Sequence, residues 1–214
     1  MVFGEVIMAT LTQAQGYVTD VRKWFSDKKG NLKTGNQVYQ ATPMKRNVKA
    51  VSDAITIQTF ELGRGNSGSW AELGALLVHT DTRSGNCAYM SALACFYAKQ
   101  KKDKIWMLDS EGDHQFCIIA DAEPSICQIK GWEATAGVYA VDAWANIACD
   151  LRGYAERFGL EMKSWSDAGM RIRTWGFRAR TATIVAQQDT NPFDPTYMTP
   201  ILETAVRLRK GWEF

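Results

Sequence analysis

Hydrophobic and polar positions in the first part of the chain follow the period of an α-helix. From Met8 to Lys29 apolar side chains recur at steps of three and four residues, and Gly30 follows as a typical helix C-terminal residue. A second apolar pattern, over residues 48–60, is rich in β-branched residues and leaves helix and strand equally open. A third pattern predicts a helix over Trp70–Val78, which Ser67 or Ser69 can cap.

The middle of the chain changes from helical to strand-like patterning. The alanine-rich composition of residues 87–98 predicts a largely buried helix that begins at Cys87 and has lysines crowded at its other end. Short β-like runs bounded by Gly, Asp, Glu or Pro then predict strands of an antiparallel sheet. These runs cover residues 105–108, 115–120, 126–129 and 138–141.

The last third returns to mixed patterning. Residues 143–158 and 199–210 have helical periodicity, and residues 171–186 are typical of one or two strands. Arginines alternate along this last segment, which predicts a solvated strand face that can also recognise an acidic partner. They are Arg171, Arg173, Arg178 and Arg180.

Composition indicates a folded globular protein. The chain has 214 residues, of which 46% are hydrophobic and 22% charged, and this predicts one domain over residues 1–214. Its net charge of 25 − 23 = +2 argues against nucleic acid as a partner of the whole surface. No stretch approaches the roughly 18 apolar residues of a membrane span, and no signal peptide pattern is present. We therefore expect a cytoplasmic protein, or one exported into a target cell without a cleaved signal.

The five cysteines differ in their surroundings. Their odd number and the lack of a CxxC pair argue against a disulfide framework and against a zinc site, so no metal is expected. Four of them lie within apolar runs and are expected to pack in the core. These four are Cys95, Cys117, Cys127 and Cys149. The fifth, Cys87, stands at a predicted helix start.

Cys87, His114 and Asp142 follow one another in the order that thiol chemistry needs. They are separated by 114 − 87 = 27 and 142 − 114 = 28 residues, and they stand at a helix start, a strand start and a strand end. A helix N-terminus and a nearby imidazolium stabilise a thiolate, which is the reactive form of cysteine. A carboxylate on a neighbouring strand fixes the histidine tautomer. Asp113 is the weaker candidate for this role, because adjacent strand residues point to opposite faces.

Catalysis also needs hydrogen-bond donors for an oxyanion, and substrate binding needs a surface. Backbone N–H groups at the start of the Cys87 helix can form an oxyanion hole together with a side-chain amide, for which the sequence offers Asn66, Asn86 or Gln115. Trp144 is a candidate for substrate binding. The second histidine, His79, is expected to be a helix C-terminal cation rather than a catalytic partner.

These motifs carry a resemblance. Gly85-Asn86-Cys87 opening a helix, then Gly112-Asp113-His114, then Asp142-Ala143-Trp144-Ala145-Asn146 resemble the motif set of papain-like and transglutaminase-like thiol hydrolases, most closely that of bacterial effector and toxin domains. The resemblance covers residues 83–150. It implies a papain-like α+β fold, in which a helical N-terminal part with the nucleophile helix packs on an antiparallel sheet, and a catalytic core over residues 64–160. It assigns Cys87 as nucleophile, His114 as general acid and base, and Asp142 as orienting carboxylate, with no cofactor.

The function expected from the resemblance is a cysteine hydrolase that acts on amide bonds of a protein substrate. The family includes proteases, deamidases of glutamine or asparagine, and acyl transferases. Some of its members are bacterial effectors and toxins. The alternative is a non-catalytic protein-binding module on an α+β scaffold. The interval between His114 and Asp142 is longer than one hairpin, so we expect an additional strand or excursion, with turns at Pro124, Gly131 and Gly137.

Overall fold

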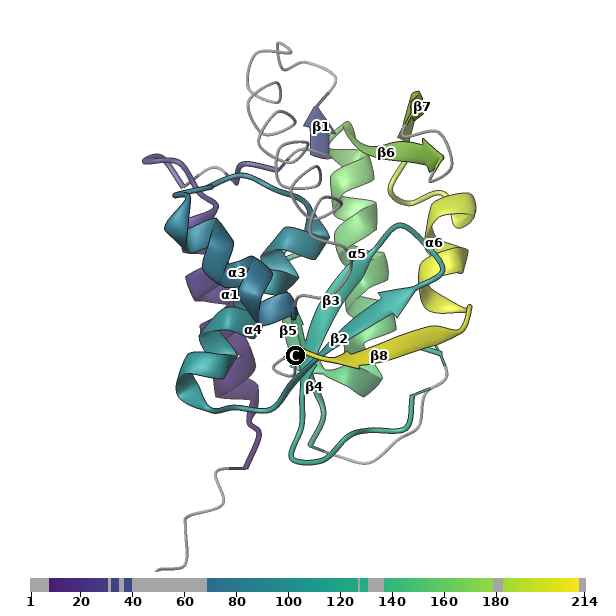
Figure 1. Ribbon diagram of the computed structural model, residues 1–214. Coiled ribbons are helices and arrows are strands. Elements are labelled where there is room, and N and C mark those ends of the chain that lie inside the picture. Colours follow the sequence, from purple (N-terminus) through teal and green to yellow (C-terminus); the bar gives the residue numbers. More distant parts are fainter. Residues whose placement is uncertain are drawn as a thin grey trace, which may run out of the picture.

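A five-stranded antiparallel sheet forms the centre of the protein (Figure 1). The computed structural model describes residues 8–30, 32–34, 37–39, 69–126, 128–130, 137–178 and 183–211. The strand order of the sheet is β5-β4-β3-β2-β8. Its strands are β2 (Ile105–Ser110), β3 (Gln115–Ile119), β4 (Tyr139–Asp142), β5 (Ile147–Asp150) and β8 (Val206–Lys210).

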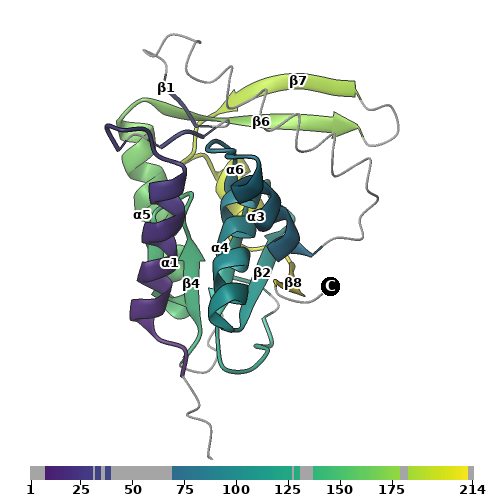
Figure 2. The ribbon, with the colours of Figure 1, turned by 60° about the vertical axis from the view of Figure 1, so that its left-hand side comes forward.

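Three helices from the N-terminal half lie on one side of this sheet, where the first and the third contact its strands and the second packs on the third (Figure 2). They are α1 (Leu11–Trp24), α3 (Trp70–His79) and α4 (Cys87–Lys101). The thiol of Cys117 in β3 donates to the Ser91 carbonyl in α4 at 3.4 Å, which fixes α4 on the sheet. The structure is thus α+β, as expected, with N-terminal helices packed on an antiparallel sheet.

Capping residues explain where two of these helices begin. Thr10 and Gln13 form a capping box at the start of α1, and Ser69 and Glu72 form one at the start of α3, so Ser69 rather than Ser67 is the cap. The first helix ends earlier than predicted, at Trp24. Gly30 lies in the turn that follows, where its φ of +80° suits glycine.

The other face of the sheet is covered by aromatic residues of a later helix. The 3₁₀ turn Leu151–Gly153 leads into α5 (Tyr154–Asp167). The rings of Phe116 in β3 and Tyr154 in α5 stack with centroids 4.2 Å apart, and Phe158 packs against Tyr154 at 5.6 Å. A short helix, α6 (Pro195–Leu202), contacts β2.

A second, three-stranded sheet has the order β1-β6-β7. It contains β1 (Gln37–Tyr39), β6 (Met170–Arg178) and β7 (Thr183–Thr190), which confirms the prediction of strands over residues 171–186. Arg171 is partly buried, Arg180 lies outside the described residues, and the side chains of Arg173 and Arg178 are not described. The solvated arginine face therefore stays a prediction.

Two predictions of helices, over residues 143–158 and 199–210, are wrong. Residues 143–146 form a tight turn between β4 and β5, in which Asn146 adopts a left-handed φ of +60°, so the predicted helix over 143–158 begins only at Tyr154. Residues 199–210 are likewise divided between α6 and β8. The alternation Val206-Arg207-Leu208-Arg209-Lys210 suits an edge strand paired with β2, and this pairing outweighs helical propensity.

The strand predicted over residues 126–129 is also wrong. Among the described residues of the β3–β4 connection none is in a strand, although Ile129 is buried. The Lys130 N–H donates to the Leu202 carbonyl at 2.7 Å, which fastens the connection to the end of α6. The extra length between His114 and Asp142 is therefore an excursion, and β3 and β4 pair directly. Gly131, Cys127 and the apolar segment 48–60 lie outside the described residues.

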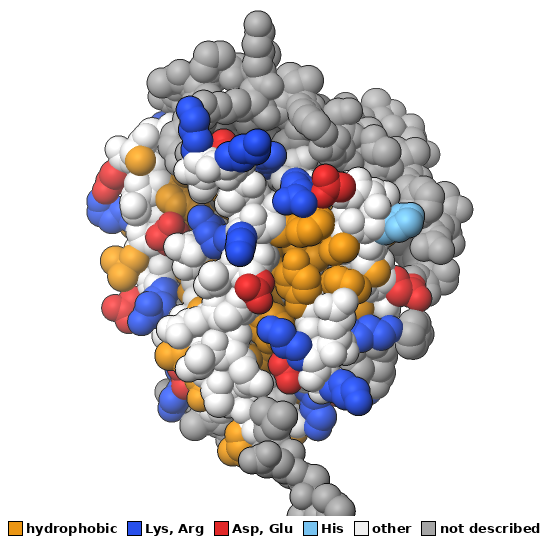
Figure 3. Space-filling model, turned by 90° about the vertical axis from the view of Figure 1, so that its left-hand side faces the viewer, with side chains coloured by type: hydrophobic (Ala, Val, Ile, Leu, Met, Phe, Trp, Pro, Cys, Tyr) orange, Lys and Arg blue, Asp and Glu red, His pale blue; other side chains and the backbone are white. Residues whose placement is uncertain are grey.

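The outer face of the N-terminal helical layer combines apolar and basic side chains (Figure 3). Hydrophobic side chains gather there in one patch that both basic and acidic side chains border. The Arg83 guanidinium lies 4.4 Å from the ring centroid of Trp24, and the Lys101 ammonium lies 4.6 Å from that of Tyr17. No helix in the described part of the chain is long and apolar enough to cross a membrane.

Candidate active site

Cys87 is the first residue of α4. Asn86 precedes it with extended backbone and caps the helix, because its side-chain oxygen accepts the Tyr89 N–H at 3.3 Å. An α-helix leaves the N–H groups of its first turn without intrahelical acceptors and concentrates positive potential there. The positive end of α4 therefore lies at Cys87, in a site so enclosed that the residue is only 5% exposed.

The sheet topology brings His114 and Asp142 together. His114 immediately precedes β3 and Asp142 ends β4, and because these neighbours are antiparallel both residues lie at the same end of the sheet. Cys117 is opposite Val141, so the register extended by one pair sets Phe116 opposite Asp142. His114 lies two residues from Phe116 on the same face and is a diagonal neighbour of Asp142. The alternation of strand residues favours Asp142 over Asp113, as the sequence predicts.

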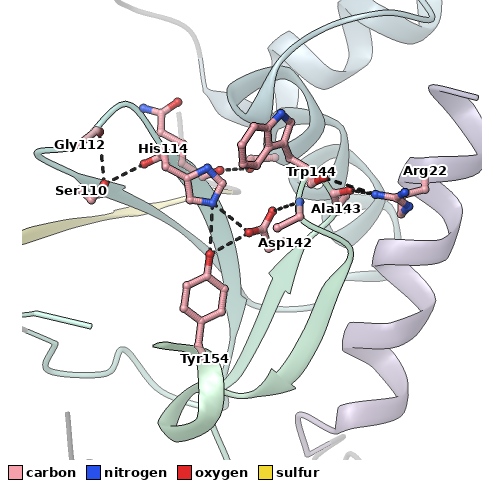
Figure 4. A network of polar contacts seen from close by, with 11 residues as sticks. Arg22, Ser110, Gly112, His114, Asp142, Ala143, Trp144 and Tyr154 are labelled. Atoms are coloured by element: carbon pink, nitrogen blue, oxygen red, sulfur yellow. Dashed lines mark hydrogen bonds and ion pairs between the residues drawn. The ribbon is translucent and has the colours of Figure 1, made fainter. Parts of the chain in front are cut away.

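Asp142 is the centre of a buried polar network (Figure 4). Its Oδ2 atom is 2.9 Å from Nε2 of His114 and accepts the Tyr154 hydroxyl at 2.8 Å, while Oδ1 accepts the Ala145 N–H at 2.9 Å. Three donors thus satisfy a carboxylate that is 1% exposed. Because an ionised carboxylate can only accept hydrogen bonds, Nε2 of His114 carries a proton.

The other ring nitrogen of His114, Nδ1, is buried and is not held by Asp142. No described residue makes a hydrogen bond of good geometry with Nδ1. Cys87 nevertheless interacts with the ring closely enough to raise the pKa of His114, both as a hydrogen-bonding neighbour and by charge. Since Nε2 is occupied by Asp142, Nδ1 is the ring nitrogen that remains for a further partner. Contacts of this kind are often long before substrate binds.

Two opposing effects act on the pKa of His114. Burial lowers the pKa of His114, but the charge of Asp142 and the hydrogen bond to it, with the smaller contribution of Cys87, outweigh burial and raise the pKa to about 10. The imidazolium is thus the stable form of the ring at neutral pH, and it can pair with a thiolate.

Aromatic rings hold His114 on its remaining sides. The ring centroids of Trp144, Phe158 and Phe116 lie 5.0, 5.1 and 5.8 Å from that of His114. Trp144, the candidate for substrate binding, lies in the core at 1% exposure with its ring against His114, and a role in substrate binding stays a prediction. Its other side contacts Trp165 at 4.8 Å.

The three amides considered for an oxyanion hole have different surroundings. The Gln115 amide nitrogen donates to the carboxylate of Asp109 across the β2–β3 pair. The side-chain oxygen of Asn86 caps α4. Asn66 lies outside the described residues. A role for any of them stays a prediction, and the backbone N–H groups at the start of α4 are the donors nearest to the thiol in sequence.

Two residues of the network have no motif in the sequence. Tyr154 donates to Asp142 and also lies 3.2 Å from Nε2 of His114, although it begins a helix 12 residues further along. Arg22 in α1 donates to the carbonyl of Ala143 at 2.8 Å and so fixes the turn that carries Trp144. Burial lowers the pKa of Arg22, and the charges of Asp142 and Glu161 oppose this shift. Only the folded topology brings these residues to the site.

The remaining cysteines confirm the prediction of core packing where they are described. Cys95, Cys117 and Cys149 are buried free thiols. Sγ of Cys95 lies 3.7 Å from Sγ of Cys117, and burial raises the pKa of Cys149 to about 11. In the part of the chain that the structure describes, no group of three or more His, Cys, Asp or Glu side chains is arranged to hold a metal ion.

Comparisons with known proteins add no relative. No protein-family model matches the chain, and neither the curated proteins nor the solved structures give a significant match. Any function must therefore be argued from the site itself.

The raised pKa of His114 predicts a pH-dependent stability. A histidine whose folded pKa lies above its unfolded value of 6.5 contributes stability that is full below pH 6.5 and is lost as pH rises towards about 10. We expect urea unfolding to show this loss in the wild type and a smaller loss in Asp142→Asn, because the variant lacks the charge that raises the pKa. Parallel pH profiles in the two proteins would contradict the ion pair.

Proposed function

We propose that this protein is a cysteine-dependent hydrolase that cleaves amide bonds through a thioester, with Cys87, His114 and Asp142 as its catalytic triad. One observation carries the proposal. The Nε2 atom of a buried His114 is held 2.9 Å from Asp142, and this leaves Nδ1 for a cysteine at a helix N-terminus. Tautomer, orientation and charge of the ring all suit a thiolate–imidazolium pair.

The reaction follows from the positions of these groups. The Cys87 thiolate attacks the amide carbonyl carbon and forms a C–S bond, and the tetrahedral intermediate collapses as the C–N bond breaks. His114 gives its Nδ1 proton to the departing nitrogen. The neutral ring then takes a proton from water, whose oxygen attacks the thioester, and the C–S bond breaks to restore the thiolate. Asp142 holds the Nε2 proton throughout.

The proposed substrate is a protein, and the reaction either hydrolyses its peptide bonds or deamidates its glutamine or asparagine side chains. The resemblance to bacterial effector and toxin domains supports both reactions and a role inside a target cell. The 5% exposure of Cys87 supports deamidation more, because a slender carboxamide side chain can enter an enclosed site more easily than a continuous backbone. Intact mass separates the two: cleavage gives two fragments, whereas deamidation leaves one chain heavier by about a dalton.

Alkylation with iodoacetamide tests the thiolate directly. At pH 6 we expect Cys87 to react at least about tenfold faster than Cys149, whose burial raises its pKa to about 11. His114→Ala removes the imidazolium and should abolish this advantage. Peptide mapping of each cysteine provides the rates, and Cys149 is an internal control in every sample.

A second histidine variant tests whether a loss of reactivity is caused by misfolding. His114→Gln keeps a hydrogen-bonding side chain beside Asp142 but cannot form an imidazolium, so it should lose the fast reaction while retaining the melting transition. If Cys87 instead reacts no faster than Cys149 in the folded wild type, the hydrolase proposal fails. The protein would then be better described as a binding module with a structural cysteine.

A further inference from the structure

Tyr197 lies on the face of α6 that covers the turn before His114. The Pro200 carbonyl of α6 accepts the Gly112 N–H at 3.2 Å. Gly112 is so close to the helix that a Cβ atom there would lie 2.5 Å from Cγ1 of Ile201. Tyr197 precedes Ile201 by four residues and shares its helix face, so its side chain is directed towards the same turn.

The hydroxyl of Tyr197 is buried without a hydrogen-bond partner in the described part of the chain. The side chain is 6% exposed, and a buried hydroxyl with no partner costs free energy. Burial, and then the charges of Cys87, Asp113 and Asp142, raise the pKa of Tyr197 well above its usual value. The phenol therefore keeps its proton, its helix packs on the turn before His114, and its donor has no acceptor among the described residues.

We propose that the Tyr197 hydroxyl donates a hydrogen bond to the oxyanion that forms when Cys87 attacks a carbonyl group. The inference rests on the proposed function. It explains why this buried donor has no partner among the described residues, since the acceptor would arrive with the substrate. It also agrees with the surroundings of Gln115, whose amide nitrogen already donates to Asp109.

Two reagents separate an oxyanion donor from a group that acts on the thiol. With p-nitrophenyl acetate, the sulfur of Cys87 forms a C–S bond to the carbonyl carbon, and p-nitrophenolate leaves after an oxyanion has formed. With iodoacetamide, the same sulfur displaces iodide from a saturated carbon, and no oxyanion forms. We expect Tyr197→Phe to slow acetylation of Cys87 about 100-fold and to leave its alkylation unchanged.

Stability should move in the opposite direction to activity. Tyr197→Phe removes a buried hydroxyl without a partner and keeps the ring, so we expect the melting temperature to rise by about 2–4 °C. A matched control is Tyr17→Phe, because the Tyr17 hydroxyl donates to Asp103, which follows the far end of α4. This control should lower the melting temperature and leave acetylation of Cys87 at the wild-type rate.

The possible outcomes are distinct. Slow acetylation with normal alkylation in Tyr197→Phe supports the inference. Acetylation at the wild-type rate overturns it and leaves the proposed hydrolase intact. An equal loss of both reactions also overturns it, because the tyrosine would then act on the thiol. If the wild type itself is not acetylated at Cys87, both the hydrolase and the oxyanion donor are rejected.

Discussion

Asp142→Asn is expected to slow acetylation of Cys87 by p-nitrophenyl acetate about 10²–10⁴-fold while the protein stays folded. The carboxylate accepts from Nε2 of His114 and raises the pKa of the ring, whereas an amide carries no charge and can present its NH₂ group to Nε2 instead. The ring would then be neutral with its lone pair on Nε2, so that Nδ1 could not take up the thiol proton. Stopped-flow detection of p-nitrophenolate, with intact mass to count acetyl groups, measures the effect.

Asp150→Asn is the matched control for this charge change. Asp150 ends the neighbouring strand β5, where it pairs with the exposed Arg152 and caps the following turn. Its replacement removes the same charge at the surface, so acetylation should stay within about twofold of the wild type. Equal rates for Asp142→Asn and the wild type would show that the buried network serves only the fold.

Trp144→Ala is expected to lower the free energy of unfolding by about 3–5 kcal/mol. The indole is almost fully buried and packs between the rings of His114 and Trp165, so its removal leaves a large cavity beside the candidate site. Acetylation of Cys87 should also fall, because one wall that orients His114 is lost. Urea unfolding and p-nitrophenolate release measure the two effects.

A cavity made elsewhere in the core distinguishes the effect of lost packing from the effect of an altered site geometry. Trp106 is as deeply buried as Trp144 but lies opposite Ile118, away from the end of β3 that follows His114. Trp106→Ala should cost comparable stability and leave acetylation nearly unchanged when both variants are compared below their melting temperatures. Trp144→Phe keeps a ring beside His114 and should fall between Trp144→Ala and the wild type. A substrate-binding role for Trp144 would instead raise KM without loss of stability.

The helices that begin at clear capping residues could be predicted from local sequence patterns. Ser69 with Glu72, and Asn86 before Cys87, are capping residues that act over three positions, so the starts of α3 and α4 can be predicted from sequence alone. The pairing of His114 with Asp142 could also be predicted, because it needs only two adjacent strands and their alternation. These features depend on neighbours in sequence or on one strand pair.

Other features depend on contacts that no short window contains. The segment Val206–Lys210 becomes a strand because β2 offers it an edge, and the turn over residues 143–146 is held by Arg22 of α1, which donates to the Ala143 carbonyl. Tyr154 joins the network from α5 and Tyr197 belongs to α6, and neither is part of the three sequence motifs. A lone tyrosine has no spacing that marks it, so both were missed. The fold class and the triad candidates were thus accessible, but the residues that support the triad were not.

The most direct test of the proposed thioester is to find where an acetyl group is attached after brief treatment with p-nitrophenyl acetate at neutral pH. We expect peptide mapping to place the first acetyl group on Cys87 in the wild type, and we expect it to be lost again as water hydrolyses the thioester. His114→Gln should acquire and lose this group slowly. Acetylation spread over lysines and other cysteines, at the same rate in both proteins, would contradict a nucleophilic Cys87.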